Sequence, residues 1–326
     1  MTVAPPPDHP ALPAPNLLRR RLQWPGVLGF LAVGAGLVAD PALTLRLLWQ
    51  VVIPLLPATF FLSPSIWRAA CPLATAGLLA ARPGEGRPLD RPASEAAGVV
   101  GLLLLGILVP LRHLVLEHDP QALLLLLVGL VLLAVLLGRG RDVKAGFCNA
   151  ICPVLPVERL YGQAPLLALG DQRCGPCTRC IPAGCPDRAP GSAFLAMIGP
   201  SPWWPCRPYG AFLAGFPGFV VGFGLVPREV DVSVTQAYGP TLLGFGVSWL
   251  LVLTGVGLFQ WGARAALPWL AWAAASGYYW FASESLRRGL GLSAGMVWPL
   301  RGVALLGLAY WLHRARQSRY PRSVFD

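Results

Sequence analysis

QALLLLLVGLVLLAVLL, residues 121–137, is the stretch that decides the fold. Every residue after Gln121 is apolar or glycine, and none is charged. Roughly 20 such residues, in a range of about 17–25, let one α-helix cross the hydrocarbon core of a bilayer. A helix can do so because it satisfies its backbone hydrogen bonds within itself. The run therefore predicts a transmembrane α-helix.

Further apolar runs lie on both sides of this one, and the composition agrees with them. The chain is 55% hydrophobic and 13% charged, with a mean hydropathy of +0.58, whereas soluble domains carry about 25% charged residues. We therefore expect an all-α polytopic membrane protein with about eight transmembrane helices and a cysteine-rich loop insertion on the cytoplasmic face. The other runs cover about residues 22–39, 42–62, 96–116, 210–226, 240–260, 265–283 and 295–312. The glycine-rich patch at 215–224 indicates close helix packing.

The formal net charge of +11 indicates orientation and not nucleic-acid binding. The basic residues gather at the ends of the apolar runs, and cytoplasmic loops carry an excess of Lys and Arg. If the N-terminus is inside, most of the 26 Lys and Arg residues, and every cysteine, fall on or near the inner face. This predicts a multi-pass protein of the bacterial inner membrane, in contact with lipid, with both termini cytoplasmic.

The chain divides into five segments by composition. We expect a disordered, proline-rich tail at 1–21, a four-helix membrane region at 22–137, and a cysteine-rich region at 138–208. A second four-helix membrane region at 209–312 and a basic tail at 313–326 follow. Arg19-Arg20-Arg21 before an apolar run also fits a signal peptide. We favour a signal anchor that stays as the first helix.

The cysteine-rich region contains RCGPCTRCIPAGCP, residues 173–186. Its spacing, C-x2-C-x2-C-x4-C-P, is one residue longer in the last gap than the bacterial iron–sulfur run. The short gaps let one loop place three sulfurs at three corners of a cubane. We predict a [4Fe–4S] cluster here. Structural zinc is the alternative, although zinc sites usually pair two knuckles with a longer spacer. The candidate ligands are Cys174, Cys177, Cys180 and Cys185.

Two shorter elements resemble each other. IWRAACP at 66–72 and FCNAICP at 147–153 each follow a pair of apolar runs. The second reads C-x3-C-P, and the first has Trp67 where a cysteine would complete that pattern. We interpret them as a duplicated helix–helix–CysPro unit with its halves packed together. The alternative is two ordinary helix ends stopped by proline.

These motifs resemble the membrane polyferredoxins of nitrate and nitrous-oxide respiration, of the quinol-dehydrogenase type. They are also similar to accessory iron–sulfur proteins of cytochrome oxidase assembly, over roughly residues 40–210. The resemblance implies electron transfer between a quinol or other donor and a redox partner protein. Those proteins carry two C-x3-C-P elements and two ferredoxin runs, whereas this chain has Trp67 in one element and a single, longer run. These differences favour one cluster over two.

Two ligand assignments stay open. One [4Fe–4S] cluster takes the four cysteines of the loop. Alternatively, because the fourth Cys of a run ligates the other cluster in two-cluster ferredoxins, Cys152 or Cys71 completes the first centre. Cys185 then joins three of Cys71, Cys148, Cys152 and Cys206 in a second. With one cluster, Cys148 and Cys152 could be a redox dithiol, since residues four apart share a helix face.

Charged residues suggest partners. Arg173 and Arg179 lie beside the loop cysteines and could attract an acidic donor such as a ferredoxin or flavodoxin. His113 and His118, near the outer end of the third apolar run, could serve a quinone or a haem. Their spacing puts them on different faces of a helix, so one shared metal is not expected. The simpler interpretation is a polar helix end at the membrane interface.

Three functions follow from these patterns. The first is a membrane-bound iron–sulfur electron-transfer protein, a component of an oxidoreductase complex. The second is an accessory or assembly factor that reduces a metal or disulfide for a membrane complex. The third is a transporter or scaffold with structural zinc. No Walker loop, Rossmann glycine motif or nucleophile elbow occurs in the sequence.

Overall fold

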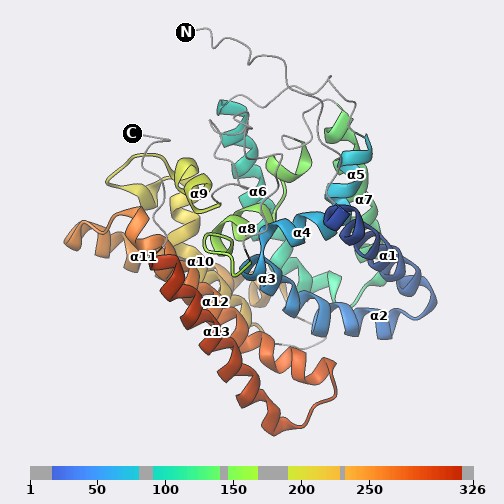
Figure 1. Cartoon of the computed structure of the whole chain (residues 1–326). Helices are drawn as coiled ribbons and strands as arrows, with labels where there is room; N and C mark the ends of the chain where they lie inside the picture. Colours follow the sequence, from blue (N-terminus) through green and yellow to red (C-terminus); the bar gives the residue numbers. More distant parts are fainter. Residues whose placement is uncertain (1–16, 81–90, 140–145, 168–189, 228–231, 318–326) are drawn as a thin grey trace.

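The computed structural model describes residues 17–80, 91–139, 146–167, 190–227 and 232–317. Over these ranges every regular element is helical and there is no strand. Figure 1 shows α1 to α7, in blue to green, on one side of the molecule and α10 to α13, in yellow to red, on the other. The expected all-helical fold is confirmed for this part of the chain.

The first half begins several of its helices at prolines. Pro41, Pro64, Pro72 and Pro120 each open a helix, where the missing N–H of proline costs no hydrogen bond. One stretch of π-helix, η1, joins α2 to α3, and a second, η2, ends α6. The elements are α1 (Leu17–Ala39), α2 (Pro41–Leu47), η1 (Leu48–Val52), α3 (Ile53–Leu62), α4 (Pro64–Ala70), α5 (Pro72–Ala80), α6 (Arg91–Leu111), η2 (Arg112–Leu116) and α7 (Pro120–Arg139).

The second half contains the longest helices. Ser233 caps α11 through a capping box with Gln236, which satisfies backbone N–H groups at the helix start. The elements are η3 (Phe147–Asn149), α8 (Leu155–Tyr161), α9 (Pro190–Ile198), η4 (Trp204–Cys206), α10 (Pro208–Gly224), α11 (Val234–Phe259), α12 (Ala263–Gly289), η5 (Ala294–Met296) and α13 (Val297–Gln317).

Each of the eight apolar runs forms a helix, but not all of these helices have the length and hydropathy of a membrane span. Six helical stretches among the described residues do: Arg21–Ala39, Pro41–Leu62, Pro92–Leu116, Pro120–Arg139, Val234–Phe259 and Ala294–Gln317. The helix Pro208–Gly224 is apolar but shorter. The structure thus agrees with a helical membrane protein, and a count of eight spans stays a prediction.

The two remaining runs, α10 and α12, pack inside the molecule. α10 lies against both α11 and α12, and one face of α12 is buried from Ala266 to Ala275. A Cβ added at Gly218 would overlap the carbonyl oxygen of Gly244, and one at Gly222 would overlap that of Pro240. Backbones approach this closely only where residues are small. The predicted glycine-mediated packing at 215–224 is therefore confirmed.

Two regions expected to be loops contain helices. The segment after Cys71 forms α5, and α6 begins at Arg91 and not at about residue 96. In the cysteine-rich region, α8 and α9 pack into the main core, with Leu160 and Phe194 fully buried. The expectation of polar loops there was wrong, because short apolar clusters gain their burial from tertiary partners. The core also includes Phe60, Trp204, Leu213 and Trp311.

Candidate functional site

The four-cysteine loop, Cys174, Cys177, Cys180 and Cys185, lies outside the described residues. Cys71, Cys148, Cys152 and Cys206 lie within them. The structure therefore describes the cysteines of the two CysPro elements, together with Cys206.

Cys71 ends α4, and Pro72 begins α5. Its N–H donates to the carbonyl of Trp67 at 2.8 Å, and the residue is buried. Burial raises the pKa of the Cys71 thiol; backbone N–H groups of Ala74 and Leu73 oppose that effect. The thiol therefore points into protein at the junction of two short helices.

Cys148 and Cys152 belong to a tight turn. Phe147–Asn149 is a 3₁₀ turn, and the N–H of Cys152 donates to the carbonyl of Phe147 at 3.1 Å. The segment is thus not the α-helical turn on which a dithiol was predicted. The two cysteines thus lie four residues apart within one tight turn.

The two CysPro elements meet in space. Burial is the main cause of the raised pKa of Cys152, and the charges of Cys148 and Cys71 raise it further. Among the described residues no three His, Cys, Asp or Glu side chains are arranged to hold a metal ion. Cys206 is exposed, at the end of η4. The structure therefore packs α5, which begins at Pro72 of the first CysPro element, against η3 of the second, and the described cysteines by themselves form no metal-binding group.

Charged residues surround this thiol group, which comprises Cys71, Cys148 and Cys152. Arg68 of α4 forms an ion pair with Glu158 of α8, so the pair joins the first CysPro element to the helix that follows the second. Glu158 and Arg159 are 5% and 3% exposed, and burying charges is costly unless they are paired. The charge of Arg68 lowers, and that of Glu158 raises, the pKa of Cys71.

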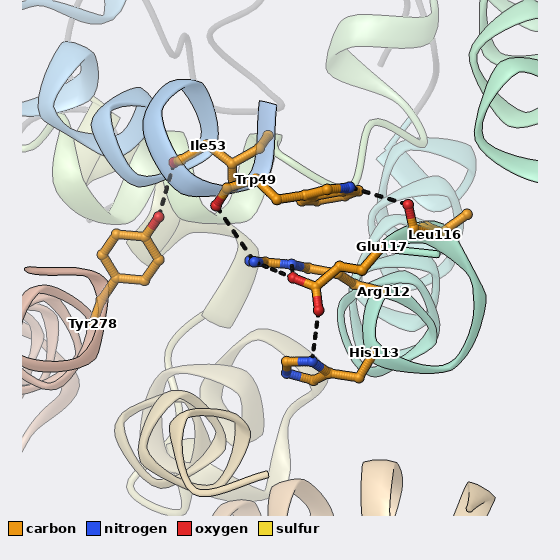
Figure 2. A network of polar contacts seen from close by, with 7 residues as sticks. All are labelled: Trp49, Ile53, Arg112, His113, Leu116, Glu117 and Tyr278. Atoms are coloured by element: carbon orange, nitrogen blue, oxygen red, sulfur yellow. Dashed lines mark hydrogen bonds and ion pairs between the residues drawn. The ribbon is translucent and has the colours of Figure 1, made fainter. Parts of the chain in front are cut away.

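A second polar group lies at the end of α6, in η2. Figure 2 shows Arg112, His113 and Glu117 converging there, with Trp49, Ile53 and Tyr278 nearby. Arg112 Nε donates to Glu117 Oε1 at 2.6 Å, and His113 Nδ1 lies 3.1 Å from Glu117 Oε2. The sequence placed two histidines here as a polar helix end. His118 is exposed, whereas His113 is 5% exposed.

The two π-helical turns, η1 and η2, hold this polar group together (Figure 2). Trp49 Nε1 donates to the carbonyl of Leu116 at 3.0 Å, and Arg112 Nη2 donates to that of Trp49 at 3.5 Å. From α12, the hydroxyl of Tyr278 donates to the carbonyl of Ile53 at 2.8 Å. A π-turn leaves a helical carbonyl available to other donors and is frequent at functional sites. The sequence singled out His113 but did not predict these contacts with η1 and α12, since π-turns have no simple residue signature.

Electrostatics keep Glu117 ionised. Burial raises its pKa, but the hydrogen bond from His113 and the charge of Arg112 outweigh burial and lower the pKa from 4.5 to about 2. Glu117 directly follows the apolar stretch Pro92–Leu116. A carboxylate held this way accepts hydrogen bonds only.

This shift predicts a pH dependence of stability. A lowered carboxyl pKa stabilises the fold above the unfolded value near 4.5, and the contribution is lost as pH falls toward about 2. It is on the order of 3 kcal/mol at most. We expect Glu117→Gln to flatten the fall in thermal stability of the detergent-solubilised protein over this pH range. An unchanged slope would contradict the assignment, and Glu95→Gln serves as the carboxylate control.

Comparison of the chain with protein-family models, with curated proteins and with solved structures gives no match. Its function is therefore inferred from its own residues.

Proposed function

We propose that this chain is an inner-membrane iron–sulfur protein that transfers electrons between a donor and a redox partner protein. The observation that carries the proposal is the run C-x2-C-x2-C-x4-C-P at Cys174–Pro186, whose gaps suit a [4Fe–4S] centre. The cluster, when bound, supplies one-electron chemistry, and the protein sets its surroundings. About eight spans with both termini cytoplasmic would place this run in the reducing compartment, where thiols persist.

The meeting of the two CysPro elements supports this proposal. Cys71 and Cys152 occupy matching positions in the two elements, and their charges interact. A duplicated unit whose halves pack side by side accounts for this placement. Arg68 and the buried Arg159 lie in or next to the same elements and would offset negative charge on thiolates.

The described cysteines can be compared with the four thiolates that a second cluster would need. A cubane takes four thiolates, and the thiol group has three, with no three-ligand arrangement among the described residues. A second centre would therefore need at least one ligand from Cys174–Cys185. The proposal accordingly assigns one cluster to Cys174, Cys177, Cys180 and Cys185.

The proposed electron donor follows from the positive charge beside the loop cysteines. Arg173 and Arg179 flank the loop cysteines and would steer an acidic, cytosolic donor of the ferredoxin or flavodoxin kind, at a rate that falls with salt. The acceptor would be a membrane complex. A quinol donor is the alternative that the resemblance to polyferredoxins suggests.

The test is anaerobic purification of the full chain in detergent, with iron, zinc and acid-labile sulfide measured per chain. About four irons and four sulfides, with an EPR signal near g ≈ 1.94 after dithionite, are expected for one reduced cubane. About eight irons would support two clusters, with the thiol group in ligation. One zinc without sulfide would overturn the electron-transfer proposal.

A second candidate function is an accessory factor that reduces a metal or disulfide for a membrane complex. The proximity of Cys148 and Cys152 favours it, because two neighbouring thiols can form or reduce a disulfide. It differs from the first proposal in one respect. Replacing both cysteines by serine would abolish its activity and leave the iron content and the EPR signal unchanged.

A further inference from the structure

The polar group of Arg112, His113 and Glu117 in η2, called the η2 site below, contains a buried nitrogen. This nitrogen has no hydrogen-bond partner among the described residues. His113 Nδ1 contacts Glu117, but His113 Nε2 has no hydrogen-bond partner among the described residues. The residue is 5% exposed, and the ring of Phe223 stacks on it with centroids 4.5 Å apart. Most buried polar side-chain atoms have a partner, so each exception needs an explanation.

The carboxylate of Glu117 determines which nitrogen carries the proton. Arg112 and Glu117 form an ion pair, and an ionised carboxylate accepts hydrogen bonds only. His113 Nδ1 must therefore donate to it. In the neutral ring Nε2 is then a bare acceptor, which is the tautomer that carboxylate–imidazole pairs impose where histidine acts as a base.

A small cavity adjoins this ring. His113 lines it with Arg112, Phe223, Tyr278 and Ser285, and its volume is about 40 Å³. That volume holds about one to three water molecules, whereas a cavity that accepts a benzene ring measures about 150 Å³. This volume is smaller than a quinone ring or a haem needs and suits water, which can reach His113 there.

The charges around His113 permit its ring to become positive, even though the positively charged Arg112 lies beside it. Arg112 and Glu117 neutralise each other, and the Arg112 guanidinium also lies 4.6 Å from the centroid of the Trp49 ring. The elements packed against His113 contribute the uncharged side chains of Pro54 from α3, Phe223 from α10, and Tyr278 and Ser285 from α12. Glu117 is thus the one anion that would face a protonated His113 among the described residues lining the site.

We propose that His113 is a proton-binding residue within the membrane, which exchanges a proton at Nε2 with water in this cavity. A hydronium ion transfers its proton to Nε2, water remains, and the imidazolium pairs with the carboxylate of Glu117. Histidine and carboxylate residues inside membrane helices commonly form proton relays. His113 lies three residues before the end of the stretch Pro92–Leu116, about one helical turn from the end of that apolar stretch. The proposal does not depend on an iron–sulfur cluster.

The four histidines of the chain allow a direct test. A full-length variant with His9, His118 and His313 changed to glutamine retains His113 alone and leaves the η2 site intact. With ¹⁵N-labelled histidine in lipid bilayers, solid-state NMR reports the protonation of each ring nitrogen. We expect Nδ1–H and bare Nε2 near pH 8, Nε2–H in acidified samples, and a correlation between Nε2–H and water.

Three results would overturn the proposal. They are an Nε2–H tautomer near pH 8, an Nε2 that stays bare throughout, and an Nε2 that responds to added short-chain hydroquinone but never correlates with water. Adding Glu117→Gln to the single-histidine variant should move a large share of the signal to the Nε2–H tautomer. If the tautomer stays unchanged, Glu117 does not set it. Iron and sulfide content play no part in these readouts, so failure here is distinct from failure of the proposed function.

Discussion

Replacing Cys177 by serine is expected to reduce bound iron from about four atoms per chain to less than one and to remove the reduced-state EPR signal. Cys177 is the second cysteine of the proposed cluster run, and a serine hydroxyl is a much poorer ligand for iron than a thiolate. Iron and sulfide analysis of anaerobically purified protein measures this, with membrane insertion checked in parallel.

Two variants control for this experiment. Thr178→Ala changes the neighbouring residue without removing a thiol, and Cys206→Ser removes the exposed cysteine before α10. Both should keep the full iron content with one cluster on the loop. If Cys206→Ser loses as much iron as Cys177→Ser, the ligand assignment is wrong.

Replacing Gly218 by alanine is expected to destabilise the membrane bundle by about 1–3 kcal/mol. The added methyl group would overlap the carbonyl oxygen of Gly244, so α10 and α11 must move apart and lose contacts. The fall in midpoint of thermal unfolding in detergent measures the effect.

Gly246 of α11 provides the matched control. A Cβ at Gly246 meets nothing within 4 Å, so Gly246→Ala removes a glycine from the same helix pair without a clash. It should leave stability unchanged or raise it by up to ~1 kcal/mol, the difference in helix propensity. Equal midpoints for the two variants would show that the α10–α11 contact can relax.

The secondary structure of the membrane region could be predicted from apolar run length. The runs at 121–137 and 295–312 correspond to α7 and α13, because any such run must satisfy its backbone groups as a helix. The short helices α4, α5, α8 and α9 were not predicted. Each has at most nine residues and would be marginal in isolation, so tertiary packing stabilises it.

The candidate sites divide in the same way. The cysteine spacing and the CysPro elements are local patterns, and they predicted the thiol group in part. The sequence singled out His113 as a candidate for a quinone or haem, or as part of a polar helix end. Its contact with Glu117, four residues on, is local, whereas the cavity beside it is formed with α10 and α12, which are far from it in sequence.

The sequence by itself determined that this chain is helical and suited to a membrane, since hydropathy and helix length act within one segment. It also determined the spacing of the loop cysteines. Only the tertiary structure decided that the two CysPro elements pack together, that α10 is an interior helix against one buried face of α12, and that His113 borders a small cavity. These features depend on which helices pack together, and that choice is made by side-chain and backbone fit between distant segments.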